Sequence, residues 1–329
     1  MLINKVRQIQ QTQKPPAILV IGDLMIDHYI WGDATRLSPE APVPIVNVKN
    51  ESTTLGGAAN VAQNLVALGA KVTLGGLIGD DVFGEQLTGI LSEEGIATDA
   101  IIKDPQRPTT VKTRVVAGSH QLVRVDREIT DPVSAELENE LVDKLDAYIS
   151  EADIVLFSDY GKGLFSFSVT QRLIQSATQK QKKVIIDPKG LNYEKYKGAY
   201  IIKPNRKELA EAAKTEKIKN IADLRKAGKT IFEQTGVEYL IVTLSEEGMV
   251  ILDESGYKLL PVKATAVFDV TGAGDTVLAT IAYFIASGLT IEEASELANH
   301  AAAIVIRRVG SATTTIDEII EDIDGSLSH

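Results

Sequence analysis

The chain has 329 residues, of which 24% are charged and 44% hydrophobic, and its formal net charge is −11. This composition is ordinary for a soluble protein with a sizeable core, and the length fits one large α/β domain with a small accessory piece. The acidic excess argues against a general nucleic-acid binder, because phosphate contacts need a basic face. Cysteine is absent, which excludes disulfides, thiolate metal sites and a cysteine nucleophile. The sequence has no secretory signal and no apolar run of about 18 residues, and we therefore expect a cytoplasmic protein.

Strand and helix patterns alternate along most of the chain. Residues 17–21 form a continuous apolar run that ends in Gly22 and Asp23, which is typical of a buried strand. Further strands are predicted at 72–78, 154–158, 184–187, 200–203 and 239–243, and helices at 60–68, 82–94, 134–150, 169–181, 207–213, 224–235, 275–286 and 291–307. The alternation predicts a mainly parallel central sheet with helices on both faces, which is a three-layer α/β/α domain.

Two β-rich stretches interrupt this alternation. Residues 31–50 contain three prolines and then alternate apolar with polar side chains, as an exposed strand does. Residues 109–126 contain two strand-like runs joined by a short turn, which predicts a hairpin. We expect the two stretches to pair into a small sheet at the edge of a main domain that covers 17–320, with 1–16 as an N-terminal extension and 321–329 as a tail. One face of this sheet would need cover from a ligand or from a second subunit.

The strongest local signal is residues 269–275 (DVTGAGD), followed by an apolar helix. Gly272, Ala273 and Gly274 allow close approach of the backbone, so that N–H groups at the helix start can hold a phosphate or a developing negative charge. Asp275 lies in the first helical turn, where a carboxylate can accept the proton of an attacking hydroxyl in phosphoryl transfer. General-base help of this kind is typically worth about 10² to 10⁴ in rate. A capped helix after a glycine turn would explain the same residues without chemistry.

Two further motifs lie beside predicted strand ends. Residues 56–60 (GGAAN) place small side chains at a helix start, where the Asn60 amide can pair with vicinal sugar hydroxyls. Helix capping by Asn60 with tight packing is the alternative. Asp23 and Asp27 follow the first strand, where ligands bind in open α/β sheets, although a solvated turn would explain them equally well.

Taken together, these segments resemble the ribokinase/PfkB family of carbohydrate kinases over residues 17–317. The glycine block from Gly56 to Gly79 matches the N-terminal signature of the family, and 269–275 matches the C-terminal one. Residues 204–208 (PNRKE) resemble its Asn-x-x-Glu motif, and 243–248 (TLSEEG) resemble the end of its nucleotide-binding strand. The resemblance implies a ribokinase-like fold in which the small sheet forms a lid over the sugar.

Three shorter motifs resemble the heptose 7-phosphate kinase subgroup of the family, at 36–44 (RLSPEAPVP), 158–163 (SDYGKG) and 187–190 (DPKG). That subgroup uses ATP to phosphorylate the anomeric O1 of D-glycero-β-D-manno-heptose 7-phosphate. The 1,7-bisphosphate then leads to ADP-heptose and the lipopolysaccharide core. In many bacteria a nucleotidyltransferase half with a His-x-Gly-His motif follows, and none of the four histidines here stands in that motif. The resemblance therefore implies a separate kinase, with another protein for the adenylyl transfer.

The resemblance also implies the sugar side of the site. Asp275 would be the general base, and the N–H groups of 272–274 would hold the transferring phosphoryl group. An acidic protein must still offer local positive charge to the 7-phosphate, for which lysine and arginine beside glycines or in the lid are candidates, unless they are only solvated surface charges. The residues expected at the sugar or its phosphate are Asp23, Asp27, Gly56, Gly57, Asn60, Arg114, Lys162 and Lys189.

The nucleotide side follows from the same comparison of motifs. ATP should bring Mg²⁺, which keeps waters and needs few protein ligands; Asn205 and Glu208 match the metal motif and would act through water. Some relatives also hold a monovalent cation, which in this sequence would lie near Asp269 and Thr271. The residues expected at the nucleotide are Asn205, Thr243, Ser245, Gly248, Asn299 and Ala303.

Other functions fit parts of the pattern. The family signatures alone also fit a kinase for ribose, fructose or fructose 6-phosphate. A silent sugar- or nucleotide-binding regulator on the same fold is a second alternative, against which the retained Asp275 argues, because a binder needs no base. A dinucleotide dehydrogenase is a weak third alternative, since Gly22 is not followed by the spaced glycines of a Gly-x-Gly-x-x-Gly fingerprint. We expect a homodimer formed through the lid.

Overall fold

The computed structural model describes residues 2–12, 14–118, 120–262 and 267–327, and within these residues nine strands form the central sheet. Its strands are β1 (Ala17–Gly22), β4 (Lys71–Gly79), β5 (Ile101–Asp104), β8 (Ile154–Ser158), β9 (Lys183–Asp187), β10 (Ile201–Ile202), β11 (Tyr239–Thr243), β12 (Met249–Leu252) and β13 (Tyr257–Leu260). They are arranged in the order β13-β12-β11-β10-β9-β8-β1-β4-β5. The strands from β11 to β5 run parallel, and β12 with β13 adds an antiparallel edge. The predicted mainly parallel sheet is confirmed.

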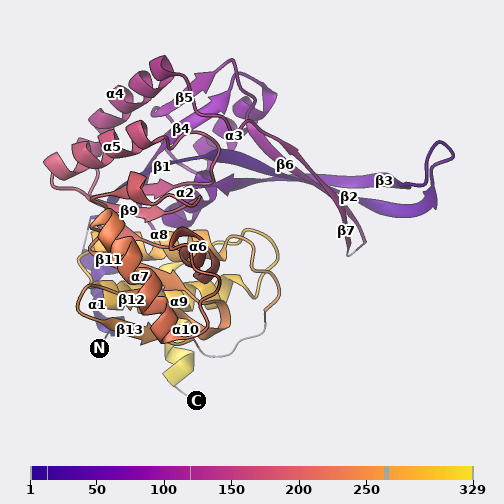
Figure 1. Ribbon diagram of the computed structural model, residues 1–329. Coiled ribbons are helices and arrows are strands. Elements are labelled where there is room, and N and C mark those ends of the chain that lie inside the picture. The colour runs from indigo at the N-terminus through magenta and orange to yellow at the C-terminus, as the bar shows by residue number, and fades with distance from the viewer. Residues whose placement is uncertain (1, 13, 119, 263–266, 328–329) are drawn as a thin grey trace.

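Helices cover both faces of this sheet (Figure 1). They are α1 (Leu2–Thr12), α2 (Ala58–Ala67), α3 (Val82–Glu93), α4 (Ala135–Glu151), α5 (Phe167–Gln179), α6 (Arg206–Ala212), α7 (Ile221–Thr235), α8 (Ala273–Ala286), α9 (Ile291–Val305) and α10 (Ile316–Leu327). Alternate residues of β1 divide between the two cores: Ile18 and Val20 pack with α1, α2, α3, α8, α9 and α10. Leu19 and Ile21 pack with α4 to α7. A strand buried on both faces must be apolar throughout, which is why 17–21 carries no polar residue. None of the helices in the described ranges is long and apolar enough to cross a membrane.

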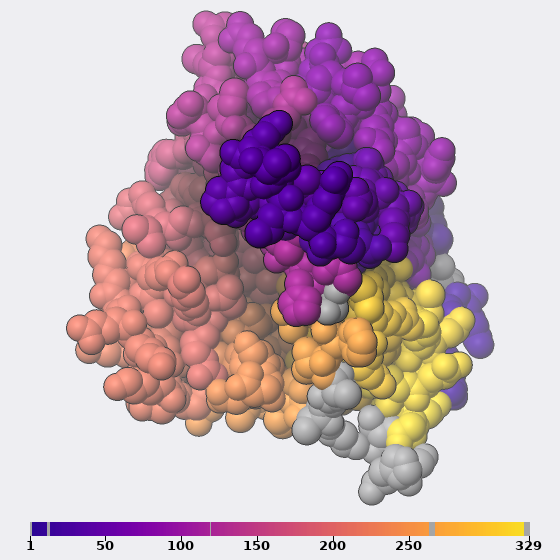
Figure 2. Space-filling view, turned by 90° about the vertical axis from the view of Figure 1, so that its right-hand side faces the viewer, coloured from indigo at the N-terminus to yellow at the C-terminus, as the bar shows by residue number. Residues whose placement is uncertain are grey.

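A second, four-stranded sheet projects from the domain as an arm (Figure 1). It consists of β2 (Leu24–Leu37), β3 (Pro44–Gly57), β6 (Thr110–Ala117) and β7 (His120–Arg127), in the order β3-β2-β6-β7, and we call it the lid sheet. The two β-rich stretches therefore pair, as predicted. The lid sheet begins at Leu24 and not at residue 31. The first residues of β2 are buried in the domain and its last residues are exposed, so the exposed-strand pattern in the sequence starts later than the strand itself. Figure 2 looks along the arm, whose indigo residues stand in front of the rest of the molecule.

Both ends of the described chain are helical, which the sequence analysis did not predict. In α1, the buried Ile3, Val6 and Ile9 form one apolar stripe on an otherwise polar helix, and this stripe joins the core. α10 buries Ile323 and continues to Leu327, so the predicted domain boundary between 320 and 321 falls inside a helix. The polar composition of 1–16 concealed an amphipathic helix because only every third residue is apolar.

Candidate active site

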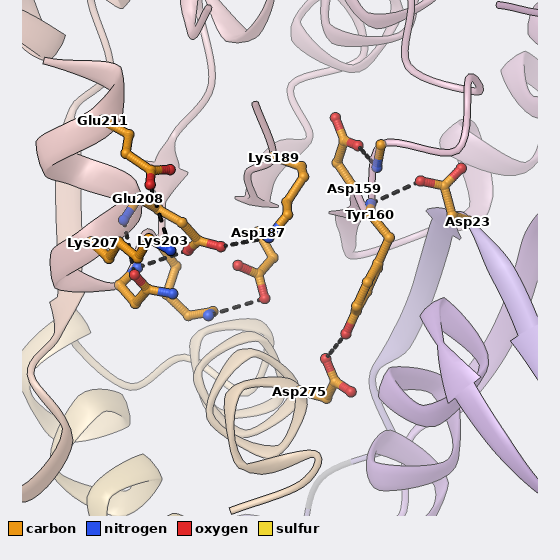
Figure 3. Close-up of polar contacts among 12 residues, drawn as sticks. Asp23, Asp159, Tyr160, Asp187, Lys189, Lys203, Lys207, Glu208, Glu211 and Asp275 are labelled. Atoms are coloured by element: carbon orange, nitrogen blue, oxygen red, sulfur yellow. Dashed lines mark hydrogen bonds and ion pairs between the residues drawn. The ribbon is translucent and has the colours of Figure 1, made fainter. Parts of the chain in front are cut away.

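A pocket of about 180 Å³ opens at the carboxyl ends of the central strands, where open α/β sheets bind ligands. Strands β8, β9, β10 and β11 and the start of α8 all contribute to it. The lining residues are Asp159, Tyr160, Asp187, Pro188, Lys189, Lys203, Asn205, Glu208, Thr243, Gly272, Gly274 and Asp275. Figure 3 shows several of these side chains converging from different elements. The sequence motifs at 158–163, 187–190, 204–208 and 269–275 thus meet in one place.

The glycine loop before α8 is shaped by a left-handed residue. Gly272 has φ +76° and begins the helix, and a Cβ at this position would lie 2.9 Å from the Asn60 amide nitrogen. Only glycine meets both conditions without strain. Asp269 stabilises this loop, because its carboxylate accepts hydrogen bonds from Thr271 and from the Gly310 backbone N–H. Gly272 and Gly274 thus line the pocket at the start of α8, and a helix start is a geometry that binds anions, although the Ala273 N–H already donates to the Val270 carbonyl at 3.2 Å.

Asp275 is buried at this helix start, with 6% of its surface exposed. The Asn60 amide donates to its Oδ2 at 2.6 Å, and the Tyr160 hydroxyl donates to its Oδ1 at 2.7 Å (Figure 3 shows the second bond). Burial raises the pKa of Asp275, while these two hydrogen bonds stabilise its charged form and oppose that rise. The carboxylate is thus oriented by two side chains and is kept available as a proton acceptor. The sequence analysis expected Asn60 at the sugar hydroxyls and did not predict that its amide donates to Asp275. Tyr160 was not singled out.

A buried ion pair lies on the other side of the pocket. Lys203, just after β10, places its amine 3.0 Å from an Asp187 carboxylate oxygen at the end of β9. Burial raises the pKa of Asp187 to about 7, with Glu208 and Asp275 adding to the rise and Lys203 opposing it. A Cβ on Gly274 would lie 4.0 Å from the Lys203 amine, so this cation stands beside the glycine loop. The sequence analysis missed Lys203, although its place directly before the Pro-Asn-x-x-Glu motif was a usable signal.

Asn205 and Glu208 form a capping box at the start of α6. The Asn205 side chain accepts from the Glu208 N–H at 2.9 Å, and Glu208 Oε2 accepts from the Asn205 N–H at 3.0 Å. The other Glu208 oxygen accepts from Lys189 at 3.1 Å. Among the described residues, no group of three or more His, Cys, Asp or Glu side chains is placed to hold a metal ion. A divalent ion here would depend on water and substrate oxygens, with Glu208 and Asp187 supplying nearby charge, which suits Mg²⁺.

Asp23 supports the 159–163 loop. One of its carboxylate oxygens accepts from the backbone N–H groups of Tyr160 and Lys162, at 2.8 and 3.1 Å (Figure 3 shows Asp23 beside Tyr160). Asp159 holds the same loop from within, because it accepts from the Gly161 N–H and binds the Lys195 amine at 2.6 Å. These contacts place the Tyr160 ring between Asp23 and Asp275. The residue that the sequence analysis assigned to the sugar thus supports the loop that carries Tyr160.

All three basic candidates for the sugar phosphate are in ion pairs. Arg114 of β6 pairs with Asp27 of β2 inside the lid sheet. Lys162 is 2.7 Å from a Glu128 carboxylate oxygen, and Lys189 lies at the opposite side of the pocket beside Glu208. The structure therefore brings Arg114 and Lys162 to the lid side and Lys189 to the side of α6. Gly56 and Gly57 end β3, and a Cβ on Gly56 would lie 2.5 Å from an Asp27 oxygen, which accounts for that glycine.

Most of the residues expected at the nucleotide lie beyond the pocket, along the same end of the central sheet. Thr243 ends β11 and lines the pocket, and Ser245 and Gly248 follow in a short turn with φ of +55° and +91°. Asn299 donates to the Leu260 carbonyl and so ties α9 to β13, while the Ala303 carbonyl accepts from Arg307. Of the six residues expected at the nucleotide, the structure places Asn205 and Thr243 among the described residues that line the pocket.

The fold and this pocket together define a ribokinase-like kinase. The structure of Arabidopsis thaliana ribokinase complexed with ribose and ATP matches with a TM-score of 0.74 and 19% identity, covering 94% of this chain and 99% of that chain. Phosphofructokinase-2 from Escherichia coli in complex with potassium matches with a TM-score of 0.77 and 18% identity, covering 96% and 100%. At such identities the likeness establishes the fold.

The family follows from sequence comparison. The model of the pfkB family carbohydrate kinases matches residues 16–318, and the chain belongs to that family. Similar curated relatives are the bifunctional protein HldE of Wolinella succinogenes, 46% identical over 311 residues, and that of Campylobacter curvus, 47% identical over 308 residues. In both comparisons the match covers 94% of this chain and 65% of the relative, so the chain spans just under two thirds of their length.

The Asp23 carboxyl predicts how stability depends on pH. Burial, with the Asp159 charge adding to it, raises the pKa of Asp23 to about 6. A carboxyl that holds its proton more tightly in the folded chain loses stability on ionisation, so its contribution to the free energy of unfolding falls as pH rises from about 4 to about 6. Asp23→Asn cannot ionise, and we expect it to gain up to about 3 kcal/mol relative to the wild type between pH 4 and pH 8.

Urea unfolding at the two pH values measures this difference. Asp143→Asn is the matched control, because this α4 carboxylate is largely exposed and should give no pH-dependent difference. An Asp23→Asn difference that stays constant across the pH range would contradict the assignment.

Proposed function

We propose that the chain is an ATP-dependent sugar kinase that phosphorylates the anomeric O1 of D-glycero-β-D-manno-heptose 7-phosphate to the 1,7-bisphosphate, a step toward ADP-heptose and the lipopolysaccharide core. The observation that carries the proposal is the buried Asp275 at the start of α8, held by Asn60 and Tyr160 beside the glycine loop. A carboxylate beside an anion-binding helix start is electrostatically costly unless it accepts a proton during the reaction. A binding protein would have no use for this arrangement.

The proposed mechanism divides the work among these residues. Asp275 accepts the proton of the anomeric hydroxyl as that oxygen attacks the γ-phosphorus of ATP, the bond from this phosphorus to the β,γ-bridging oxygen breaks, and ADP leaves. The N–H groups at 272–274 donate to the transferring phosphoryl oxygens, where preorganised donors act most strongly. Lys203 adds a buried positive charge next to the same loop. Mg²⁺ bound with the nucleotide would neutralise phosphate charge, and Glu208 would help to hold it through water.

The choice of heptose phosphate over other sugars has two supports. The motifs at 36–44, 158–163 and 187–190 resemble the heptose 7-phosphate kinase subgroup, and two of the three line the pocket. The identity of 46–47% to the bifunctional HldE proteins is far above the 18–19% to ribokinase and phosphofructokinase-2. Ribose, fructose and fructose 6-phosphate remain the alternative acceptors, and a silent regulator is the alternative without chemistry.

A substrate panel with an Asp275 variant tests the proposal. Purified protein with ATP and Mg²⁺ should release ADP with D-glycero-D-manno-heptose 7-phosphate and not with ribose, fructose or fructose 6-phosphate. Asp275→Asn should lower kcat by about 10² to 10⁴ and leave ATP binding intact, because it removes the base and preserves the shape. Asp143→Asn is the control and should retain full activity.

Three outcomes separate the hypotheses. Turnover of a different sugar would keep the mechanism and reject the heptose assignment. Full activity of Asp275→Asn would reject the hypothesis that Asp275 is the general base. ATP binding without any turnover would favour the regulator.

Tyr160 gives a second kinetic prediction. Its hydroxyl stabilises the Asp275 carboxylate, so Tyr160→Phe should raise the pKa of that group further. Because the base must be ionised, the acidic limb of kcat/KM against pH should move to higher pH, with the largest loss of activity below neutrality. Tyr148→Phe, a half-buried tyrosine of α4, is the control. An unshifted limb with a uniformly lower rate would mean that Tyr160 serves only in packing.

We also propose that two copies associate through the lid sheet. Its exposed apolar side chains, among them Val48, Val123 and Val125, form a surface that an isolated arm would leave in water. Val123→Lys with Val125→Lys should convert a dimer to a monomer in analytical ultracentrifugation. Phe167→Lys, an equally exposed apolar position on α5, should leave the dimer unchanged. A monomeric wild-type chain at micromolar concentration would reject the proposal.

A further inference from the structure

Lys112 occupies the middle of β6, on the face of the lid sheet that turns toward the pocket. Its amine lies 5.6 Å from the centroid of the Tyr160 ring, and the hydroxyl of that ring donates to Asp275. One aromatic side chain therefore separates the lid amine from the proposed base. In the sheet register Lys112 stands between Asp27 of β2 and Asp126 of β7.

The neighbouring cations of the lid side are each neutralised by a carboxylate. Arg114 pairs with Asp27, and Arg124 pairs with Asp126. Lys162 pairs with Glu128 at 2.7 Å. Within the described part of the chain, no ion pair joins a carboxylate to the Lys112 amine: Asp27 is taken by Arg114 and Asp126 by Arg124.

Lys112 is at the same time half-buried. Burial lowers the pKa of its amine, the nearby Lys162 lowers it further, and Asp27 and Glu128 oppose this from a distance. An ammonium group that is partly removed from water without a carboxylate partner is costly. The cost is recovered when an anion binds there, and a lysine amine is a suitable point charge for a phosphate group.

Resting on the proposed function, we infer that Lys112 binds a phosphate that the acceptor sugar already carries, and so selects a sugar phosphate over a neutral sugar. The Tyr160 side chain reaches from the lid amine to Asp275. A sugar whose reacting hydroxyl lies at Asp275 would extend along the same path toward the lid. A phosphate on the carbon far from that hydroxyl would then arrive at Lys112, with Lys162 as the adjacent cation.

Sequence analysis had assigned this task to Arg114, Lys162 and Lys189. Arg114 and Lys189 are committed to Asp27 and Glu208, and Lys189 stands on the α6 side of the pocket. Lys112 stands between Val111 and Thr113 in an alternating strand pattern, where the sequence does not distinguish a binding lysine from a solvated edge charge. Only the pairing of β6 with β2 and the position of Tyr160 distinguish it.

The test compares acceptors with and without the phosphate. For Lys112→Gln, KM for D-glycero-D-manno-heptose 7-phosphate should rise about 10- to 100-fold, as loss of a charge-assisted contact to phosphate predicts, while kcat changes little. Turnover of the unphosphorylated heptose should be unchanged. Lys112→Arg should recover most of the preference. Lys103→Gln, an exposed lysine paired with Asp80, is the control and should behave as the wild type.

The outcomes distinguish this inference from the proposed function. Equal losses for both acceptors would overturn it, because Lys112 would then act only through the lid or Tyr160. An unchanged preference would overturn it as well. A wild-type chain that prefers a different sugar phosphate, with a preference that depends on Lys112, would reject the heptose assignment and retain the inference. A wild-type preference for neutral sugars would overturn the inference and leave the kinase activity standing.

Discussion

The site depends on one buried carboxylate. Removing Asp275 from water disfavours its charged form, and the fold compensates with two short hydrogen bonds that come from separate parts of the chain. Asn60 requires α2 to pack on α8, which the Asn64–Thr276 hydrogen bond reinforces at 2.8 Å. Tyr160 requires the loop after β8, which Asp23 and Asp159 fix by their own hydrogen bonds. The positions of α2, α8 and the loop after β8 are thus all tied to the hydrogen bonds that stabilise the charged form of Asp275.

The remaining charges of the site follow the same logic. Cations stand opposite carboxylates at the buried Lys203–Asp187, the half-buried Lys195–Asp159 and the more exposed Lys189–Glu208. An acidic protein can present such cations to phosphates only locally, because its overall field repels anions. The pairs also keep the pocket near neutrality before the nucleotide arrives, at the cost that each phosphate must compete with a resident carboxylate. Asp187 shows that this compensation is incomplete, because burial raises its pKa to about 7 although Lys203 lies beside it.

The sequence predicted six of the nine strands described for the central sheet, most of the helices and the pairing of the two β-rich stretches, because apolar periodicity and glycine punctuation are local signals. It did not predict β5, β12 and β13. It also did not predict α1 or α10. In these helices a few isoleucines and valines lie within polar sequence, and only their packing against the core shows that they form apolar faces. In the site, Asn60, Asp275 and the glycine loop were found from motifs. Tyr160 and Lys112 were missed because their proposed roles depend on which side chains face them across strands, and spacing along one chain does not encode that. Lys203 was missed although it directly precedes the Pro-Asn-x-x-Glu motif.

The attachment of the lid sheet has a mechanical consequence. Only Asp23 separates β1 from β2, and β3 passes into α2 without an intervening residue after Gly57. Two of the four strands of the arm are therefore rooted at Asp23 and at the glycine pair before Asn60, with no linker at either root. Asp23 accepts from the loop that carries Tyr160, and Asn60 and Tyr160 both donate to Asp275. A tilt of the arm at these two roots would therefore first displace the residues that orient Asp275.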